Sequence, residues 1–223
     1  MTRGGVPAAK ICFSTVGQIF GFLVVRSKYS RLWRAAAMVD GEALGRAFVQ
    51  RTPEKWELNQ YWYSAATIAA IVKEVEERAT KAAFLSTPSV YFSLKDLQLR
   101  KCSFVFDVDA QWSRSPNYVK WDFNKPKEIP EAFHHSFDFV VIDPPFITSE
   151  VWTKYAEAAR LLLAENGKIL LSTIMENSQL LERMLDVKPQ VFQPCIPHLV
   201  YQYVFFTNYD ATNLGVPNPE VEQ

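Results

Sequence analysis

The sequence is poor in the residues that cross-link small folds or bind metal ions. Its 223 residues include 3 cysteines, Cys12, Cys102 and Cys195, which are far apart and form no Cys-x-x-Cys pair. Such spacing predicts neither a disulfide framework nor a zinc site. Of the 3 histidines, His134 and His135 lie in a polar stretch that is typical of a solvated loop. We therefore expect no metal.

The sequence also lacks an excess of either charge, with 24 basic and 24 acidic residues. The balance is uneven, because residues 1–37 contain 6 basic and no acidic side chains, and residues 38–223 contain 18 basic and 24 acidic ones. A body this acidic is poorly suited to bind a phosphate backbone, which is held largely by lysine and arginine. It is better suited to attract a basic protein surface. We expect a protein substrate rather than a nucleic acid.

The apolar run of residues 11–25 has 15 residues and is interrupted by polar ones, whereas a membrane-spanning helix needs about 20. We expect no membrane segment there. The acid-free residues 1–37 resemble an organellar presequence, but we favour an upstream extension without a folded role, with translation starting at Met38. We assign residues 38–223 to one domain, with a core of about 54–210. We expect a cytoplasmic monomer, with organelle targeting by residues 1–37 as the alternative.

From residue 52 onward, short apolar runs alternate with amphipathic stretches. The expected strands are 82–86, 103–106, 118–121, 137–142, 168–173, 191–192 and 201–207, and the expected helices are 64–79, 90–99, 149–163 and 179–185. Alternating strands and helices predict an α/β fold with a doubly wound, mostly parallel sheet. The last two strands are joined by a short loop, so the final strand should be antiparallel. We expect the tail after Asp210 to be disordered.

Polar residues follow the first three expected strands, at the sheet edge where α/β folds bind ligands. Residues 86–89 (Ser-Thr-Pro-Ser) lead into a helix whose N-terminus can donate to a carboxylate. Asp107 or Asp109 can accept ribose hydroxyls. Asp122 can accept from an adenine amino group, beside the aromatic ring of Phe123. Each residue alone could be a cap or a turn residue, but together they predict an adenosyl ligand.

The fourth expected strand ends in Asp143-Pro144-Pro145-Phe146, the most specific motif in the chain. The two prolines stiffen the turn and remove two N–H donors. A carboxylate and a backbone carbonyl remain as acceptors, with Phe146 as an apolar wall. Two acceptors suit an amine nucleophile, whose N–H groups they hold while its lone pair attacks an electrophilic methyl group. These four residues are the expected catalytic turn.

Three segments together resemble the eukaryotic elongation factor 1-alpha lysine methyltransferase family, once labelled as an N6-adenine DNA methyltransferase. They are residues 56–64 (Trp-Glu-Leu-Asn-Gln-Tyr-Trp-Tyr-Ser), 86–91 (Ser-Thr-Pro-Ser-Val-Tyr) and 135–146, which ends in the catalytic turn. The resemblance covers about residues 54–210. It implies a seven-stranded Rossmann-like methyltransferase fold, S-adenosylmethionine as donor, and a lysine of the elongation factor as acceptor.

The resemblance also implies roles for single residues. Ser86, Pro88 and Ser89 match the donor-binding loop, and Asp122 matches the adenine contact. The family form has Glu-x-Asp where this chain has Asp107-Val108-Asp109, so the ribose contact is divided between these two aspartates.

Within the 56–64 segment, three adjacent aromatic residues cannot all point into a core. We therefore expect Tyr61 and Trp62 to line the methionine end of the donor or the lysine channel.

Two other functions stay open at this point. One is an adenine methyltransferase acting on nucleic acid, which would need to flip the base and hold the backbone. The chain has neither a spare recognition region nor a basic patch after residue 37. The other is a catalytically inactive methyltransferase fold that serves as a binding module, against which the intact Asp143 turn argues.

Overall fold

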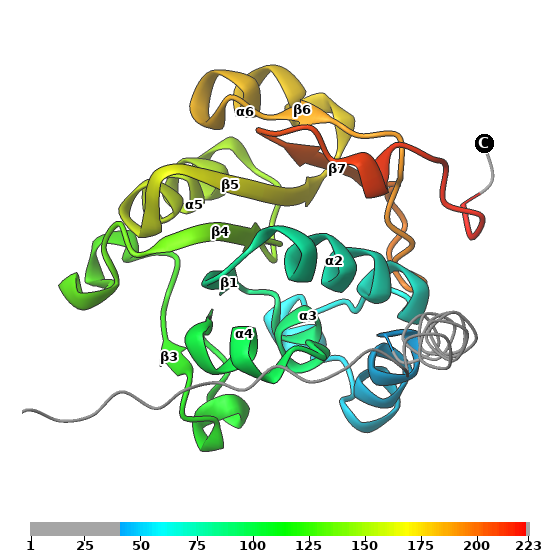
Figure 1. The fold of residues 1–223 in the computed structure, drawn as a ribbon. Helices are drawn as coiled ribbons and strands as arrows, with labels where there is room; N and C mark the ends of the chain where they lie inside the picture. The colour runs from blue at the N-terminus through cyan, green and yellow to red at the C-terminus, as the bar shows by residue number, and fades with distance from the viewer. Residues whose placement is uncertain (1–40, 222–223) are drawn as a thin grey trace, which may run out of the picture. The chain divides into compact units, whose positions relative to one another are not determined.

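Residues 41–221 of the computed structural model are described, and they form a single sheet with helices on both faces (Figure 1). The strands are β1 (Ala82–Leu85), β2 (Phe104–Asp107), β3 (Tyr118–Lys120), β4 (Phe137–Ile142), β5 (Leu163–Thr173), β6 (Lys188–Pro189) and β7 (Val204–Thr207). The longer helices are α2 (Ala65–Arg78), α3 (Pro88–Phe92), α4 (Leu97–Cys102), α5 (Ser149–Leu162) and α6 (Ser178–Leu185). Short 3-10 helices are η1 (Trp56–Leu58), η2 (Ala110–Arg114), η3 (Pro126–Glu128), η4 (Glu131–Phe133), η5 (Met175–Asn177) and η6 (Thr212–Leu214).

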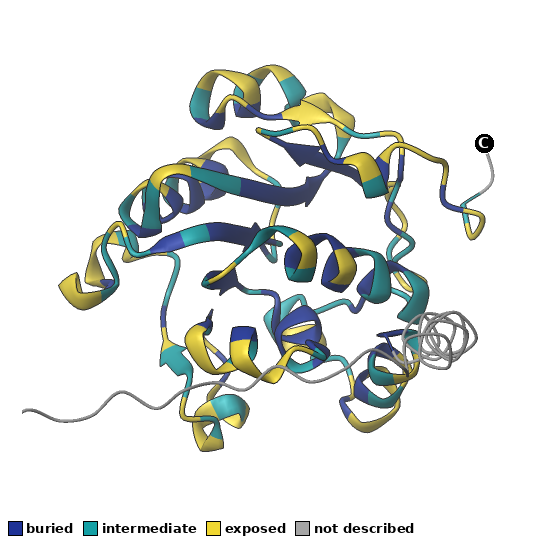
Figure 2. Ribbon diagram, viewed as in Figure 1, coloured by how far each residue is buried: buried dark blue, intermediate teal, exposed yellow. Residues whose placement is uncertain are grey.

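Alternate residues of each central strand enter two different cores. In β1, Ala83 and Leu85 pack with α5 and α6, whereas Ala82 and Phe84 pack with α2, α3 and α4. Successive strand residues point to opposite faces, so a strand covered on both faces must be apolar throughout. The strands are accordingly buried, while the outer faces of the helices are exposed (Figure 2).

The strand order is β3-β2-β1-β4-β5-β7-β6. The pairs among β1 to β5 are parallel, and β7 is antiparallel to both β5 and β6. The expected fold class is therefore confirmed. The order reverses between β1 and β4, where Leu85 pairs with Ile142. Since ligands bind where the strand order reverses, the adjacent loops that begin at Ser86 and Asp143 flank the expected site.

The single helix expected over residues 90–99 is wrong, because α3 ends at Phe92 and α4 starts at Leu97. The Ser93 hydroxyl donates to the Ser89 carbonyl at 2.7 Å. The carboxylate of Asp96 then accepts from the N–H groups of Gln98 and Leu99 at 2.8 and 3.1 Å. Aspartate at this position satisfies two otherwise unpaired donors and starts a new helix.

The C-terminal region also differs from expectation. The strand expected at 191–192 is at Lys188–Pro189, because the N–H of Phe192 instead donates to Leu214 in the tail, at 2.9 Å. The expected disorder after Asp210 is wrong as well. Leu214 is fully buried, and the side-chain amide of Asn218 donates to the Gln193 carbonyl at 2.8 Å.

Residues 41–51 form a helix that the sequence analysis did not predict. Its Phe48 ring contacts the rings of Trp62 and Trp112, with centroids 5.2 and 5.8 Å away. Gly45 permits a close approach to α2, since a Cβ there would lie 3.1 Å from the Cβ of Ile68. The expected extension 1–37 lies outside the described residues. Within residues 41–221, no helix is both long and apolar enough to cross a membrane.

Candidate active site

Two adjoining cavities open at the carboxyl ends of the central strands. The main cavity is lined by residues 58–62, by the residues that end β1, β2 and β4, and by Ile196, Leu199 and Tyr203 of the 190–203 loop. The side cavity shares four lining residues with the main one. Most of its other lining residues are aromatic, namely Trp121, Phe123, Phe146 and Tyr155. The site therefore lies where the reversal of strand order predicts it.

Asp143 of the expected catalytic turn lines the main cavity and is half-buried. The hydroxyl of Ser172, on β5, donates to its Oδ1 at 2.8 Å. The Tyr63 hydroxyl lies 2.7 Å from the Ser172 hydroxyl. Since Ser172 gives its proton to Asp143, Tyr63 is the donor in this second bond. Burial raises the pKa of Asp143 to about 7, even though the hydrogen bonds from Ser172 and Tyr63 act to lower it.

The rest of the turn is held from the other side. Asn59 has a left-handed backbone, with φ of 50°, and its side-chain amide donates to the Pro145 carbonyl. Among residues 41–221, no donor reaches the Pro144 carbonyl. Asp143 and Pro144 both line the main cavity. Phe146 is 50% exposed and lines the side cavity.

The structure separates the two aspartates that the sequence could not. Asp107 lines the main cavity, and burial raises its pKa to about 7, against the hydrogen bond from the Asp109 N–H. Asp109 lines neither cavity. Lys55 donates to both of its carboxylate oxygens, at 2.9 and 2.7 Å. Burial alone would raise the pKa of Asp109, but the hydrogen bonds from Lys55 and Gln111 outweigh it and lower that pKa.

The loop after β1 is only partly at the cavities. Ser86 lines both of them and has a left-handed backbone, with φ of 55°. Its hydroxyl lies 2.6 Å from the hydroxyl of Tyr155. Pro88 and Ser89 instead begin α3 and are buried, and neither lines a cavity.

The loop after β3 also lies only partly at the cavities. Phe123 lines the side cavity, with its ring 6.4 Å from that of Phe146 and 5.7 Å from that of Tyr155. Asp122 lines neither cavity, and its Oδ1 accepts from the backbone and side-chain nitrogens of Asn124 at 2.9 and 3.1 Å.

Tyr61 and Trp62 both line the main cavity. Trp62 is 5% exposed and donates from its indole nitrogen to the Thr52 carbonyl at 2.8 Å. Tyr63, the third aromatic residue of this cluster, is buried and reaches Ser172. The sequence analysis missed the roles of Asn59, Tyr63 and Ser172, and it also missed the wall from the 190–203 loop. Nothing in the local sequence around Ser172 marks it as a partner of Asp143.

Three buried polar atoms near the cavities have no hydrogen-bond partner within residues 41–221. They are Gln60 Oε1, Thr87 Oγ1 and Trp121 Nε1. An unpaired polar atom in a buried site costs free energy unless a water molecule or a ligand satisfies it. Gln60 lines the main cavity and Trp121 the side cavity. Their unpaired atoms suit a ligand that carries both donors and acceptors.

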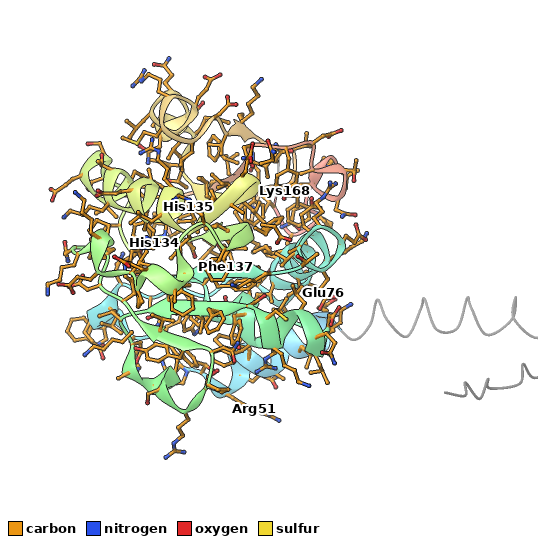
Figure 3. The ribbon with its side chains drawn as sticks, turned by 60° about the vertical axis from the view of Figure 1, so that its left-hand side comes forward. Arg51, Glu76, His134, His135, Phe137 and Lys168 are labelled. Carbon is orange, nitrogen blue, oxygen red and sulfur yellow. The ribbon has the colours of Figure 1, made fainter. Side chains whose placement is uncertain are left out.

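The two histidines of the loop before β4 have no part in this site. Figure 3 labels His134 and His135 beside Phe137, the first residue of β4, whereas Asp143 follows the other end of that strand. Their ring nitrogens lie 3.0 Å from the backbone carbonyls of Ile129 and Leu163, respectively. Among the residues that the structure describes, no three His, Cys, Asp or Glu side chains form a group that could hold a metal ion.

Comparison with known proteins identifies relatives over the same region. The family model described as "Probable N6-adenine methyltransferase" matches residues 54–211. The EEF1A lysine methyltransferase 1 of Mus musculus is 35% identical over 167 residues, which are 71% of this chain and 76% of the relative. The Homo sapiens protein of the same name is 33% identical over 167 residues, again 71% of this chain and 76% of the relative. A Pyrococcus horikoshii structure described as an RNA methyltransferase has a TM-score of 0.53 at 14% identity, covering 76% of this chain and 97% of the other. That structure shows the fold alone.

The raised pKa of Asp143 predicts that this carboxyl group destabilises the empty protein. Well below pH 4 the side chain is protonated in both the folded and the unfolded chain. As the pH rises toward 7, the unfolded chain releases its proton first, so the folded state loses relative stability. Asp143→Asn cannot titrate, so its free energy of unfolding should exceed that of the wild type by at least about 1 kcal/mol at pH 8, because a tenfold change in proton affinity is worth about 1.4 kcal/mol. The difference should disappear near pH 4 in urea denaturation.

Asp109→Asn is the control of opposite sign, because the pKa of Asp109 is lowered. Its replacement should destabilise the protein at pH 8 and still do so near pH 4, because the stabilisation is lost only as the pH falls below the ordinary value of 3.8 and through the lowered pKa of Asp109. A stability difference for Asp143→Asn that stays constant between pH 4 and pH 8 would contradict the raised pKa.

Proposed function

The chain belongs to the family of the EEF1A lysine methyltransferase 1 proteins, and we propose from this premise that it methylates a lysine of translation elongation factor 1-alpha with S-adenosylmethionine as donor. It is a protein-lysine N-methyltransferase by family. The observation that carries the proposal is the pair of acceptors, the Asp143 carboxylate and the Pro144 carbonyl, which the main cavity presents among aromatic walls. Two hydrogen-bond acceptors in an acidic, partly apolar cavity suit an amine substrate better than an anionic or apolar substrate.

The residues present fit the proposed donor. S-adenosylmethionine supplies an electrophilic methyl group on a sulfonium centre. Asp107 is the residue we assign to the ribose hydroxyls, because its carboxylate lines the cavity while that of Asp109 is occupied by Lys55. Phe123 and Trp121 provide aromatic faces in the side cavity for the adenine ring. Gln60 lines the main cavity, and we assign its unpaired Oε1 as the acceptor for the ammonium group of the methionine end.

Asp143 would act mainly by orientation. A lysine amine has an ordinary pKa of about 10.4 and arrives protonated at neutral pH. Burial among aromatic residues lowers the pKa of that amine, whereas the Asp143 carboxylate raises it. A carboxylate and a carbonyl at fixed positions hold the two remaining N–H groups of the neutral amine and aim its lone pair. Ser172 and Tyr63 are positioning residues in this scheme, because they fix Oδ1 of Asp143 and leave Oδ2 for the substrate.

The test of the function is methyl transfer from labelled S-adenosylmethionine to purified elongation factor 1-alpha. We expect label in the protein band, insensitive to nuclease, and mass spectrometry should locate it on a lysine. Asp143→Ala should abolish turnover while donor binding persists, and Asp143→Asn should retain a small rate because it keeps one acceptor oxygen. Transfer to nucleic acid in place of protein would refute the proposed acceptor. An Asp143→Ala variant with close to the wild-type rate would refute the catalytic turn.

The assignment of the ribose contact gives a separate prediction. Asp107→Ala should weaken the affinity for S-adenosylmethionine by about 1–3 kcal/mol, the usual loss when a buried polar group is left unpaired. Asp109→Ala should weaken it less, because its carboxylate is bound to Lys55 and Gln111 instead of facing the cavity. Isothermal titration calorimetry of the two variants measures both affinities. A larger loss in Asp109→Ala than in Asp107→Ala would reverse the assignment.

The hydrogen-bonded chain behind Asp143 gives another prediction. Tyr63→Phe and Ser172→Ala should each lower kcat about tenfold or more, since small misplacements of reacting groups are costly, with donor affinity unchanged. The hydrogen bonds from Ser172 and Tyr63 lower the pKa of Asp143, so removing either one should raise that pKa. Both variants should therefore shift the acid limb of the pH–rate profile to higher pH.

Two variants serve as controls for that chain. Ser172→Thr keeps the hydroxyl and should retain activity. Tyr91→Phe removes the hydroxyl of another buried tyrosine, which donates to the Arg100 carbonyl outside both cavities, and it should leave the pH–rate profile unchanged. An unshifted profile in both Tyr63→Phe and Ser172→Ala would show that the two residues are only structural.

A further inference from the structure

The two most exposed large apolar side chains of the described residues lie beside the main cavity. Val200 is 95% exposed and Trp56 is 86% exposed. Each is close in sequence to a residue that lines the cavity, since Leu199 precedes Val200 and Leu58 follows Trp56 by two positions. Tyr201, next to Val200, is 63% exposed. We call Trp56, Val200 and Tyr201 the mouth patch.

The two segments that carry the mouth patch are tied together by one carboxylate. Glu54 accepts from the backbone N–H of Trp62 at 2.8 Å, and its other oxygen lies 2.7 Å from Nδ1 of His198. Trp56 lies between Glu54 and Trp62 in sequence, and Val200 lies two residues after His198. The contact therefore places the two segments that carry Trp56 and Val200 next to each other, beside residues that line the main cavity.

The charges around this surface select the kind of partner. The 190–203 loop contains no Lys, Arg, Asp or Glu. Residues 54–62, which include Trp56, contain one cation, Lys55, and it is paired with Asp109. Glu57 of the same segment is exposed at the side cavity. Asp107 and Asp143 lie within the cavity itself. No unpaired cation of these segments is available to hold a phosphate backbone, whereas a basic segment would meet carboxylates on approach.

We propose that the mouth patch is the docking surface for the protein substrate, and that it binds apolar side chains next to the target lysine on a folded, basic surface segment. This inference rests on the proposed function and deepens it, because it places recognition outside the cavity that performs the transfer. Exposed apolar groups of this size are typical of interaction sites, and tryptophan is enriched among the residues that dominate binding energy. One lysine side chain is identical to another, so discrimination among lysines requires contacts outside the cavity, at its rim.

The test measures initial rates of methyl transfer to purified elongation factor 1-alpha over a range of its concentrations. Trp56→Ala and Val200→Ser should each raise KM for the protein about tenfold, while kcat stays within about twofold and the affinity for S-adenosylmethionine is unchanged. Val216→Ser is the matched control, since Val216 is 62% exposed and lines neither cavity. Leu97→Ala is a second control, on the 63% exposed Leu97 of α4. Both controls should have the wild-type KM.

The outcomes separate the two proposals. If the wild-type chain methylates the elongation factor and the mouth-patch variants have the KM of the controls, the docking surface is wrong and the proposed function stands. If the wild-type chain transfers no methyl group to the elongation factor, the proposed acceptor and the docking surface argued from it both fall. If Trp56→Ala converts a dimer of this chain to a monomer in sedimentation, the patch is an interface between two copies, which also overturns the proposal.

Discussion

The site depends on one carboxylate that the fold keeps in an unfavourable place. Burial penalises the charged form of Asp143 and raises its pKa to about 7. Two hydroxyl groups in series compensate part of that penalty, and both come from other elements, Ser172 from β5 and Tyr63 from the segment before α2. The orientation of Asp143 therefore requires β4 and β5 to pair in register and the 59–63 segment to lie over their ends. Small errors in any of these elements would release the carboxylate.

The sequence predicts those parts of the fold whose signal is local. Strand β4 is recognisable because burial on both faces makes nearly every residue apolar, and the Asp143-Pro144-Pro145-Phe146 turn is recognisable because two prolines restrict the backbone. The break between α3 and α4 was missed, since Asp96 also fits the exposed face of a continuous helix. The ordered tail was missed because Asn218 looks like a loop residue until the distant Gln193 carbonyl is beside it.

The same contrast between local signals and long-range contacts applies to the site. Asp107 and Asp109 are equivalent in sequence, and only Lys55, 54 residues earlier, distinguishes them by pairing with one. Tyr63 and Ser172 are separated by 109 residues, and a serine in an apolar strand has no feature that marks it as a partner of a carboxylate. Family resemblance places the catalytic turn, but contacts between distant segments decide which neighbouring side chains support it. These contacts follow from the strand order, and no local pattern encodes them.

An unstable carboxylate is useful to an enzyme whose substrate is a cation. With a pKa near 7, Asp143 exchanges its proton at neutral pH in the empty protein, so part of the population is uncharged. An incoming ammonium group favours the charged form, and by linkage the charged form favours the ammonium group. An apolar side chain gains nothing from this coupling and still has to displace water from the carboxylate. Burying the charged form of Asp143 costs folding free energy, and a bound cation offsets part of that cost. The burial of Asp143 therefore favours lysine over an apolar side chain.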